Sequence, residues 1–203
     1  APAGAISLFP YSKGGRRPCS FDMSYAELHC LSNYSFLRGA SHPSELVEQA
    51  VQLGYSALAL TDECSLAGVV KAHVMAKELN FKLIIGSEFT VSEGLKIVAL
   101  APSRAAYGEL SSLISRSRRR SAKGHYMTHL RDVYFHLKRC FIIWIPMDIE
   151  SECHHAKILA RRSPGRFWIG VSQLLRHDDL ARLVDLQRLA SEMSACTMRL
   201  RMA

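Results

Sequence analysis

The sequence lacks the marks of several common protein classes. Its six cysteines are scattered, with no CxxC pair and no dense framework, which excludes a zinc ribbon and a disulfide scaffold. Reduced, mostly buried thiols are expected instead, as in a cytoplasmic protein. No apolar run approaches the ~20 residues that a membrane span requires, and no GxGxxG or GxxxxGK[ST] loop follows an apolar run. With 203 residues, 48% of them hydrophobic, the chain predicts one soluble, well-buried domain with no membrane partner.

Positive charge is plentiful and uneven. The net charge of +8 permits an acidic partner, and nucleic acid is the commonest one for such a balance. The densest cluster comprises Arg116, Arg118, Arg119, Arg120 and Lys123. These side chains are candidates for contact with DNA phosphates. A solvated loop or helix end is the alternative interpretation of the same run.

The first 24 residues carry no periodic pattern and are expected to form a disordered extension. Six short apolar runs follow, each predicted to be a strand. They span residues 28–31, 57–60, 83–85, 96–100, 140–145 and 167–171.

Helical patterns separate most of these strands. One begins at Ser41-His42-Pro43, another is expected over residues 66–79 with Ser65 as its N-cap, and others lie near 152–162 and 178–193. Near-continuous apolar strands joined by helical crossovers indicate a parallel sheet buried on both faces. A barrel and an open doubly wound sheet both satisfy this pattern. We favour a barrel, because the phosphate-binding loops of the open sheet are missing.

Three strand ends carry polar residues of the kind that hold metals, and their surroundings resemble a known family. The segments read YAELHCLSNYSFLRGAS at 25–41, GYSALALTDECSLAGVV at 54–70 and LIIGSEF at 83–89. They are similar to the PHP (polymerase and histidinol phosphatase) domain of bacterial DNA polymerase III alpha subunits, and most of all to its error-prone DNA polymerase branch.

The resemblance implies a distorted, TIM-like (β/α)7 barrel over residues 25–193, at the N-terminus of a much longer polymerase. The parent would act in DNA replication and in damage-associated (translesion) DNA repair, with DNA and the remaining polymerase domains as partners. The resemblance places the polymerase carboxylates in a later domain, so polymerisation is not expected of these 203 residues.

The metal site of active family members can be followed position by position. They read roughly HxH[ST]xxSxxDG at the first strand, TDH at the second, GxE at the third and His at the fourth. His29, Asp62 and Glu88 keep their positions here, and Glu63 replaces a histidine. These four residues are the vestigial metal ligands that the resemblance implies.

Other positions depart from the family. Leu31 stands at the second histidine, Arg38 at the aspartate and Lys96 at the fourth strand's histidine. Leu31 donates no lone pair, and a fixed positive charge ~4 Å from a cation costs on the order of 4 kcal/mol at an effective dielectric near 20. We therefore expect no cofactor and no catalytic residue. The hypothesis is that Arg38 and Lys96 neutralise Glu63 and Glu88 as a salt-bridge network that keeps the barrel mouth folded.

Alternatives remain for these residues. The domain could be a phosphoesterase or a 3′–5′ proofreading exonuclease that uses zinc or manganese at His29, Asp62, Glu63 and Glu88. Individually, His29 could be a strand-end residue with an ordinary hydrogen-bond partner. Asp62 could cap the helix that follows it.

The C-terminal end departs furthest from the family. No GDxH element follows residue 193, and the last ten residues, 194–203, are expected to be an aberrant tail. A barrel without its last strand, and an open sheet edge, would result. A truncated or frameshifted gene product is the hypothesis that accounts for this tail.

Overall fold

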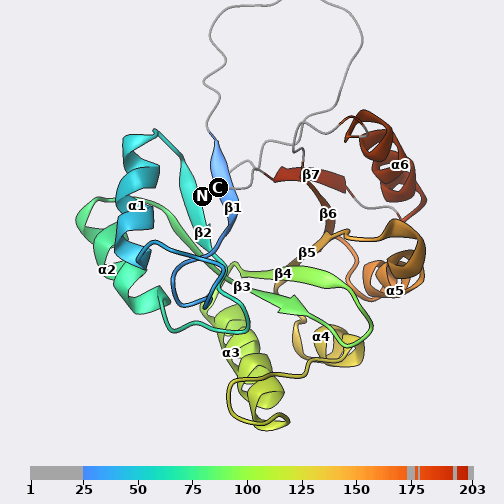
Figure 1. The fold of residues 1–203 in the computed structure, drawn as a ribbon, viewed down its shortest axis with the longest axis horizontal. Coiled ribbons are helices and arrows are strands. Elements are labelled where there is room, and N and C mark those ends of the chain that lie inside the picture. Colours follow the sequence, from blue (N-terminus) through green and yellow to red (C-terminus); the bar gives the residue numbers. More distant parts are fainter. Residues whose placement is uncertain (1–24, 173–176, 178, 194–195, 201–203) are drawn as a thin grey trace, which may run out of the picture.

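The computed structural model describes residues 25–172, 177, 179–193 and 196–200. Within them, seven strands form one sheet whose spatial order is the order of the sequence (Figure 1). The strands are β1 Ala26–Cys30, β2 Ala57–Leu60, β3 Leu83–Thr90, β4 Lys96–Ala101, β5 Phe141–Ile145, β6 Phe167–Ser172 and β7 Cys196–Leu200. The sheet curls until β7 approaches β1, which confirms the predicted barrel-like architecture. The predicted extension at residues 1–24 lies outside the described residues.

The described residues also form six helices, which lie on the outside of the curled sheet (Figure 1). They are α1 Pro43–Gln52, α2 Val69–Glu78, α3 Arg104–Arg119, α4 Leu130–His136, α5 Ile149–Arg162 and α6 Asp179–Glu192. Among these described helices, none is long and apolar enough to cross a membrane. The helix predicted from Ser41-His42-Pro43 begins at Pro43 as expected, and Glu45 accepts the N–H of His42 at its start.

The barrel wall has two apolar layers. On neighbouring strands, Ile97 and Trp144 pack outward with the helices, whereas Val98 and Ile143 belong to a separate inner cluster. All four side chains are fully buried. Because successive strand residues point to opposite faces, a strand buried on both sides must be apolar throughout. The continuous apolar runs therefore predicted the positions of β1 to β6, although β3 continues to Thr90, five residues beyond the predicted strand at 83–85.

The sheet is mixed rather than parallel throughout, which corrects the prediction. β4 runs antiparallel to both β3 and β5, with Thr90 opposite Lys96 where the chain reverses. Only residues 91–95 join β3 to β4, and a parallel crossover needs a dozen or more. The N–H of Val91 donates to the carbonyl of Leu95 (2.9 Å), which closes a tight connection. The reversal carries Lys96 to the end of the sheet where β3 finishes.

The C-terminal segment also differs from the expectation of a missing last strand. Residues 196–200 form β7, which pairs in parallel with β6 from Trp168–Cys196 to Ser172–Leu200. The expectation came from the lack of a family motif, but the hydrogen bonds of a ladder join backbone groups and need no particular side chains. Among the described residues, β7 pairs with β6 alone, so the curled sheet keeps an edge beside β1.

Two helical predictions are corrected. α2 begins at Val69, with Gly68 rather than Ser65 as its N-cap residue, and the Ser65 hydroxyl instead accepts the N–H of Ala67 (3.1 Å) in the preceding turn. The short helix α4 was not predicted. Its seven residues are too few for a recognisable helical period.

Candidate functional site

The ends of four strands bring one polar cluster together at the mouth of the barrel. His29 lies in β1, Glu63 follows β2, Glu88 lies near the end of β3, and Lys96 opens β4. Arg38 comes from the loop between β1 and α1. A backbone bridge between residues 63 and 88 holds the two carboxylate-bearing segments side by side. We call these five residues the mouth cluster.

Glu88 is the centre of the mouth cluster, and its side chain is fully buried. The guanidinium of Arg38 grips both carboxylate oxygens, with Nη1 at 2.5 Å from Oε1 and Nη2 at 3.1 Å from Oε2. The Nε2 atom of His29 lies 2.6 Å from Oε2, and Nζ of Lys96 lies 3.9 Å from Oε1. Three basic side chains therefore converge on one buried carboxylate, and the hydrogen-bond partner expected for His29 is Glu88.

Arg38 joins the two acidic residues to each other. Its Nη1 atom also donates to Oε2 of Glu63 (2.9 Å). The hydrogen bond to Glu88 is the largest influence on Arg38 and raises the pKa of its guanidinium, which keeps it charged. The other Glu63 oxygen accepts the hydroxyl of Tyr126 (2.8 Å). The predicted contacts of Arg38 with Glu63 and Glu88, and of Lys96 with Glu88, are thus present.

Asp62 serves a different purpose from the mouth cluster. Its carboxylate is buried and accepts three hydrogen bonds: from the N–H of Ser32 (2.8 Å), the hydroxyl of Ser32 (2.7 Å) and the hydroxyl of Ser35 (2.8 Å). The prediction that Asp62 caps the following helix is therefore wrong, because the serines that it binds lie in the loop after β1. Asp62 fixes the loop that presents Arg38.

The same loop is closed by a glycine. A Cβ atom on Gly39 would lie 2.1 Å from the carbonyl oxygen of Ser32, a distance that no side chain tolerates. This close approach of two backbone segments needs glycine. The N–H of Gly39 also donates to the carbonyl of Ser35 (3.0 Å). Arg38 is therefore held between a serine network and a tight turn.

The donor set does not fit a divalent metal. Zinc and manganese sites need several histidine and carboxylate ligands that converge on an open position. Here the guanidinium of Arg38 lies between Glu63 and Glu88 and engages both. Among the described residues, no three His, Cys, Asp or Glu side chains are arranged so that they could hold an ion.

The negative charge of Glu88 predicts how the stability of the fold changes at acid pH. Burial would raise the pKa of this carboxyl, but the hydrogen bonds from His29 and Arg38 and the charge of Lys96 outweigh it and lower the pKa from 4.5 to about 2. A lowered pKa stabilises the fold above pH 4.5, and this contribution is lost as the pH falls towards 2. The stabilisation is of order 3 kcal/mol.

Glu88→Gln is the matching variant, because glutamine has the shape of the protonated acid. We expect the wild type to be more stable at pH 7 and the difference to shrink steadily below pH 4.5. Urea unfolding of both proteins across that range measures it. A difference that stays constant from neutral to acid pH would contradict the charged network.

The predicted DNA-contact residues divide into two groups. Arg118 is used inside the protein: its guanidinium donates to the carbonyls of Cys64 (3.2 Å) and Glu63 (3.3 Å). Arg120 pairs with Asp132 of α4. Arg116, Arg119 and Lys123 are exposed. The sequence placed these five together, and the fold gives partners within the protein to Arg118 and to the exposed Arg120.

The sequence did not indicate that Arg118, predicted as a DNA contact, and Tyr126 support the site. Arg118 lies over the ring of Tyr126, 5.3 Å from its centre, and both side chains hold the segment that carries Glu63. They lie 55 and 63 positions beyond Glu63, so no local pattern links them. The hydroxyl of Tyr126 also accepts the N–H of Thr90 (3.0 Å) at the end of β3.

Most of the chain is similar to a known domain family and to larger bacterial proteins. The family model described as "PHP domain" matches residues 27–184. The error-prone DNA polymerase of Saccharophagus degradans is 52% identical over 170 residues, which are 83% of this chain and 16% of that protein. The error-prone DNA polymerase of Methylococcus capsulatus is 52% identical over 176 residues, 86% of this chain and 17% of that protein. The chain thus spans about one sixth of these relatives.

Two solved structures share the fold at low identity. One is assigned as a metal-dependent phosphoesterase of Bifidobacterium adolescentis, with a TM-score of 0.66, 16% identity, and coverage of 88% of this chain and 87% of that one. The other is an amidohydrolase of Chromobacterium violaceum with bound sulfate and no metal, with a TM-score of 0.64, 17% identity, and coverage of 87% and 86%. At such identities the likeness concerns the fold alone.

Proposed function

This chain belongs to the PHP domain family, and from that premise we propose that it is the PHP domain of an error-prone DNA polymerase and acts there as a non-catalytic scaffold. The observation that carries the proposal is the position of Arg38. Its guanidinium lies between Glu63 and Glu88 and hydrogen-bonds to both. A side-chain cation thereby takes the electrostatic role that metals have in active members of the family.

The scaffold role follows from what the mouth cluster connects. Glu88 joins β3 to β1 through His29, to β4 through Lys96 and to the first loop through Arg38. Glu63 extends the network to the segment after β2 and, through Tyr126, to the segment before α4. The ion pairs of the mouth cluster therefore hold together the strand ends that a bound metal would otherwise hold.

The role of the parent protein is part of the proposal. In it, the remaining domains would polymerise DNA in damage-associated translesion synthesis and repair, and DNA and those domains would be the partners. Cytoplasmic location follows from the same relationship. The PHP domain itself would need no metal cofactor and contribute no catalytic residue.

A metal-dependent phosphoesterase or 3′–5′ proofreading exonuclease is the second candidate. One observation favours it: the fold brings the side chains of His29, Glu63 and Glu88 to the same mouth. Against it stand Leu31, which offers no ligand, and Arg38, which occupies both carboxylates. The fold likeness to a protein assigned as a metal-dependent phosphoesterase does not decide between the two.

A hydrolysis assay separates these functions. The purified chain is given a generic phosphodiester and an oligonucleotide labelled at its 5′ end, with Mn²⁺ or Zn²⁺ added. We expect no turnover above that of the Glu88→Ala variant, because a water nucleophile needs a metal to activate it in this chemistry. Metal-dependent turnover that disappears in Glu88→Ala would establish the enzyme instead.

A further inference from the structure

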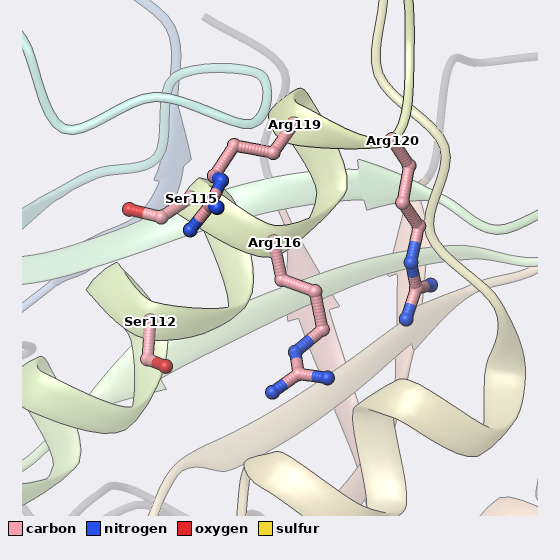
Figure 2. A pocket seen from close by; sticks show the side chains of 5 residues that line it. All are labelled: Ser112, Ser115, Arg116, Arg119 and Arg120. Carbon is pink, nitrogen blue, oxygen red and sulfur yellow. The ribbon is translucent and has the colours of Figure 1, made fainter.

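A basic hollow, separate from the mouth cluster, lies along one face of α3. Ser112, Ser115, Arg116 and Arg119 recur at helical spacing, so they lie on one side of the helix. Together with Arg120 they line a hollow of about 450 Å³ (Figure 2). We call these five residues the α3 hollow. All its members carry hydrogen-bond donors, and three carry a permanent positive charge.

The charge of the α3 hollow is balanced only in part, by the ion pair of Arg120 with Asp132. No Asp or Glu occurs between Glu109 and Asp132. Asp132 is buried and engaged by Arg120, and Glu109 pairs with Arg139. Within the part of the chain that the structure describes, no ion pair involves Arg116 or Arg119. Their guanidinium groups are therefore free to meet an anion.

A helix-end explanation accounts for only part of this arrangement. Arginines in the last turn of a helix interact favourably with its negative C-terminal end. That effect explains Arg118 and Arg119 equally, yet Arg118 turns inward to the carbonyls of Glu63 and Cys64. The inward anchor fixes the end of α3 against the barrel, so Arg116 and Arg119 project from a supported helix.

We propose that the α3 hollow binds the phosphodiester backbone of a nucleic acid strand without reading its bases. Arginine matches a phosphate with two parallel hydrogen bonds, and serine hydroxyls commonly add further phosphate contacts. No aromatic ring lines the hollow, so it offers no platform on which bases could stack. The choice of DNA as the polymer rests on the proposed function, since DNA is what such a polymerase handles.

A pair of double variants tests the α3 hollow. Arg116→Gln/Arg119→Gln removes two charges from it, whereas Lys77→Gln/Lys82→Gln removes two exposed charges from the region of α2 and β3. Fluorescence anisotropy with a labelled single-stranded oligonucleotide, over a salt series, gives the affinity and its salt slope. We expect the arginine variant to bind about tenfold more weakly at low salt and its slope to fall by about 1.4, while the lysine control stays within about twofold.

Several results would overturn the inference. Equal losses in the two double variants would mean that binding follows net charge alone. Equal affinity for polyglutamate would show a general polyanion surface, and displacement of the oligonucleotide by millimolar inorganic phosphate would show a site for a single free phosphate. Failure of the scaffold proposal is a separate result: the purified chain would show metal-dependent hydrolysis, while the difference in oligonucleotide binding between the two double variants would be unchanged.

Discussion

Arg38→Ala should lower the free energy of unfolding by about 3 kcal/mol. The substitution leaves Glu88 buried without its main partner, and breaking a buried ion pair from one side typically costs about 3–5 kcal/mol. The lower end applies because the Arg38 side chain is 32% exposed and because His29 and Lys96 remain beside Glu88. Urea unfolding at pH 7 measures the change.

Two further variants identify the cause of that loss. Arg139→Ala breaks an exposed pair with Glu109, so it should cost no more than about 1 kcal/mol. Adding Glu88→Gln to Arg38→Ala removes the stranded charge, so the double variant should lose less stability than the two single losses added together. Strict additivity would mean that Arg38 stabilises the fold through packing rather than through Glu88.

The triple substitution Leu31→His/Arg38→Asp/Lys96→His should create a metal site. It removes two positive charges from beside Glu88 and supplies three ligands at the positions where active family members carry them. Each charge near a cation is unfavourable by several kcal/mol, so the affinity for Zn²⁺ or Mn²⁺ should rise at least about a hundredfold. Isothermal titration calorimetry of the folded variant gives the affinity.

The matched control separates lost repulsion from gained ligands. Arg38→Met/Lys96→Met removes the same two charges and adds no nitrogen or oxygen ligand. This variant should bind metal more weakly than the triple variant. A triple variant that is folded, as judged by circular dichroism, but binds no more tightly than the wild type would refute the view that these three residues displaced the metals.

The strands could be predicted because the barrel buries them on both faces. The strand Phe141–Ile145 is apolar throughout because alternate side chains pack against the helices and into the separate inner cluster. The antiparallel β4 could have been inferred from the ten residues between the predicted strands 83–85 and 96–100, because a parallel crossover needs a dozen or more. β7 could not be inferred from a family motif, because its pairing with β6 depends on backbone groups.

The mouth cluster could be predicted in part. Its charges were recognised because Arg38 and Lys96 stand at positions where active family members carry metal ligands. The role of Asp62 was missed because its partners, Ser32 and Ser35, belong to another strand's loop. Tyr126 was missed for the same reason. It lies 63 positions beyond Glu63, and only the folding of α3 and the segment after it brings its hydroxyl to the Glu63 carboxylate.

The most direct test of the central claim is the metal stoichiometry of the wild-type chain. The protein is incubated with Zn²⁺ and, separately, with Mn²⁺, passed through a desalting column and measured by plasma mass spectrometry beside Glu88→Gln. If Arg38 and Lys96 have replaced the metals, the wild type should retain no more ion than Glu88→Gln does, and far less than one per chain. One retained ion per wild-type chain that is lost in Glu88→Gln would contradict the account.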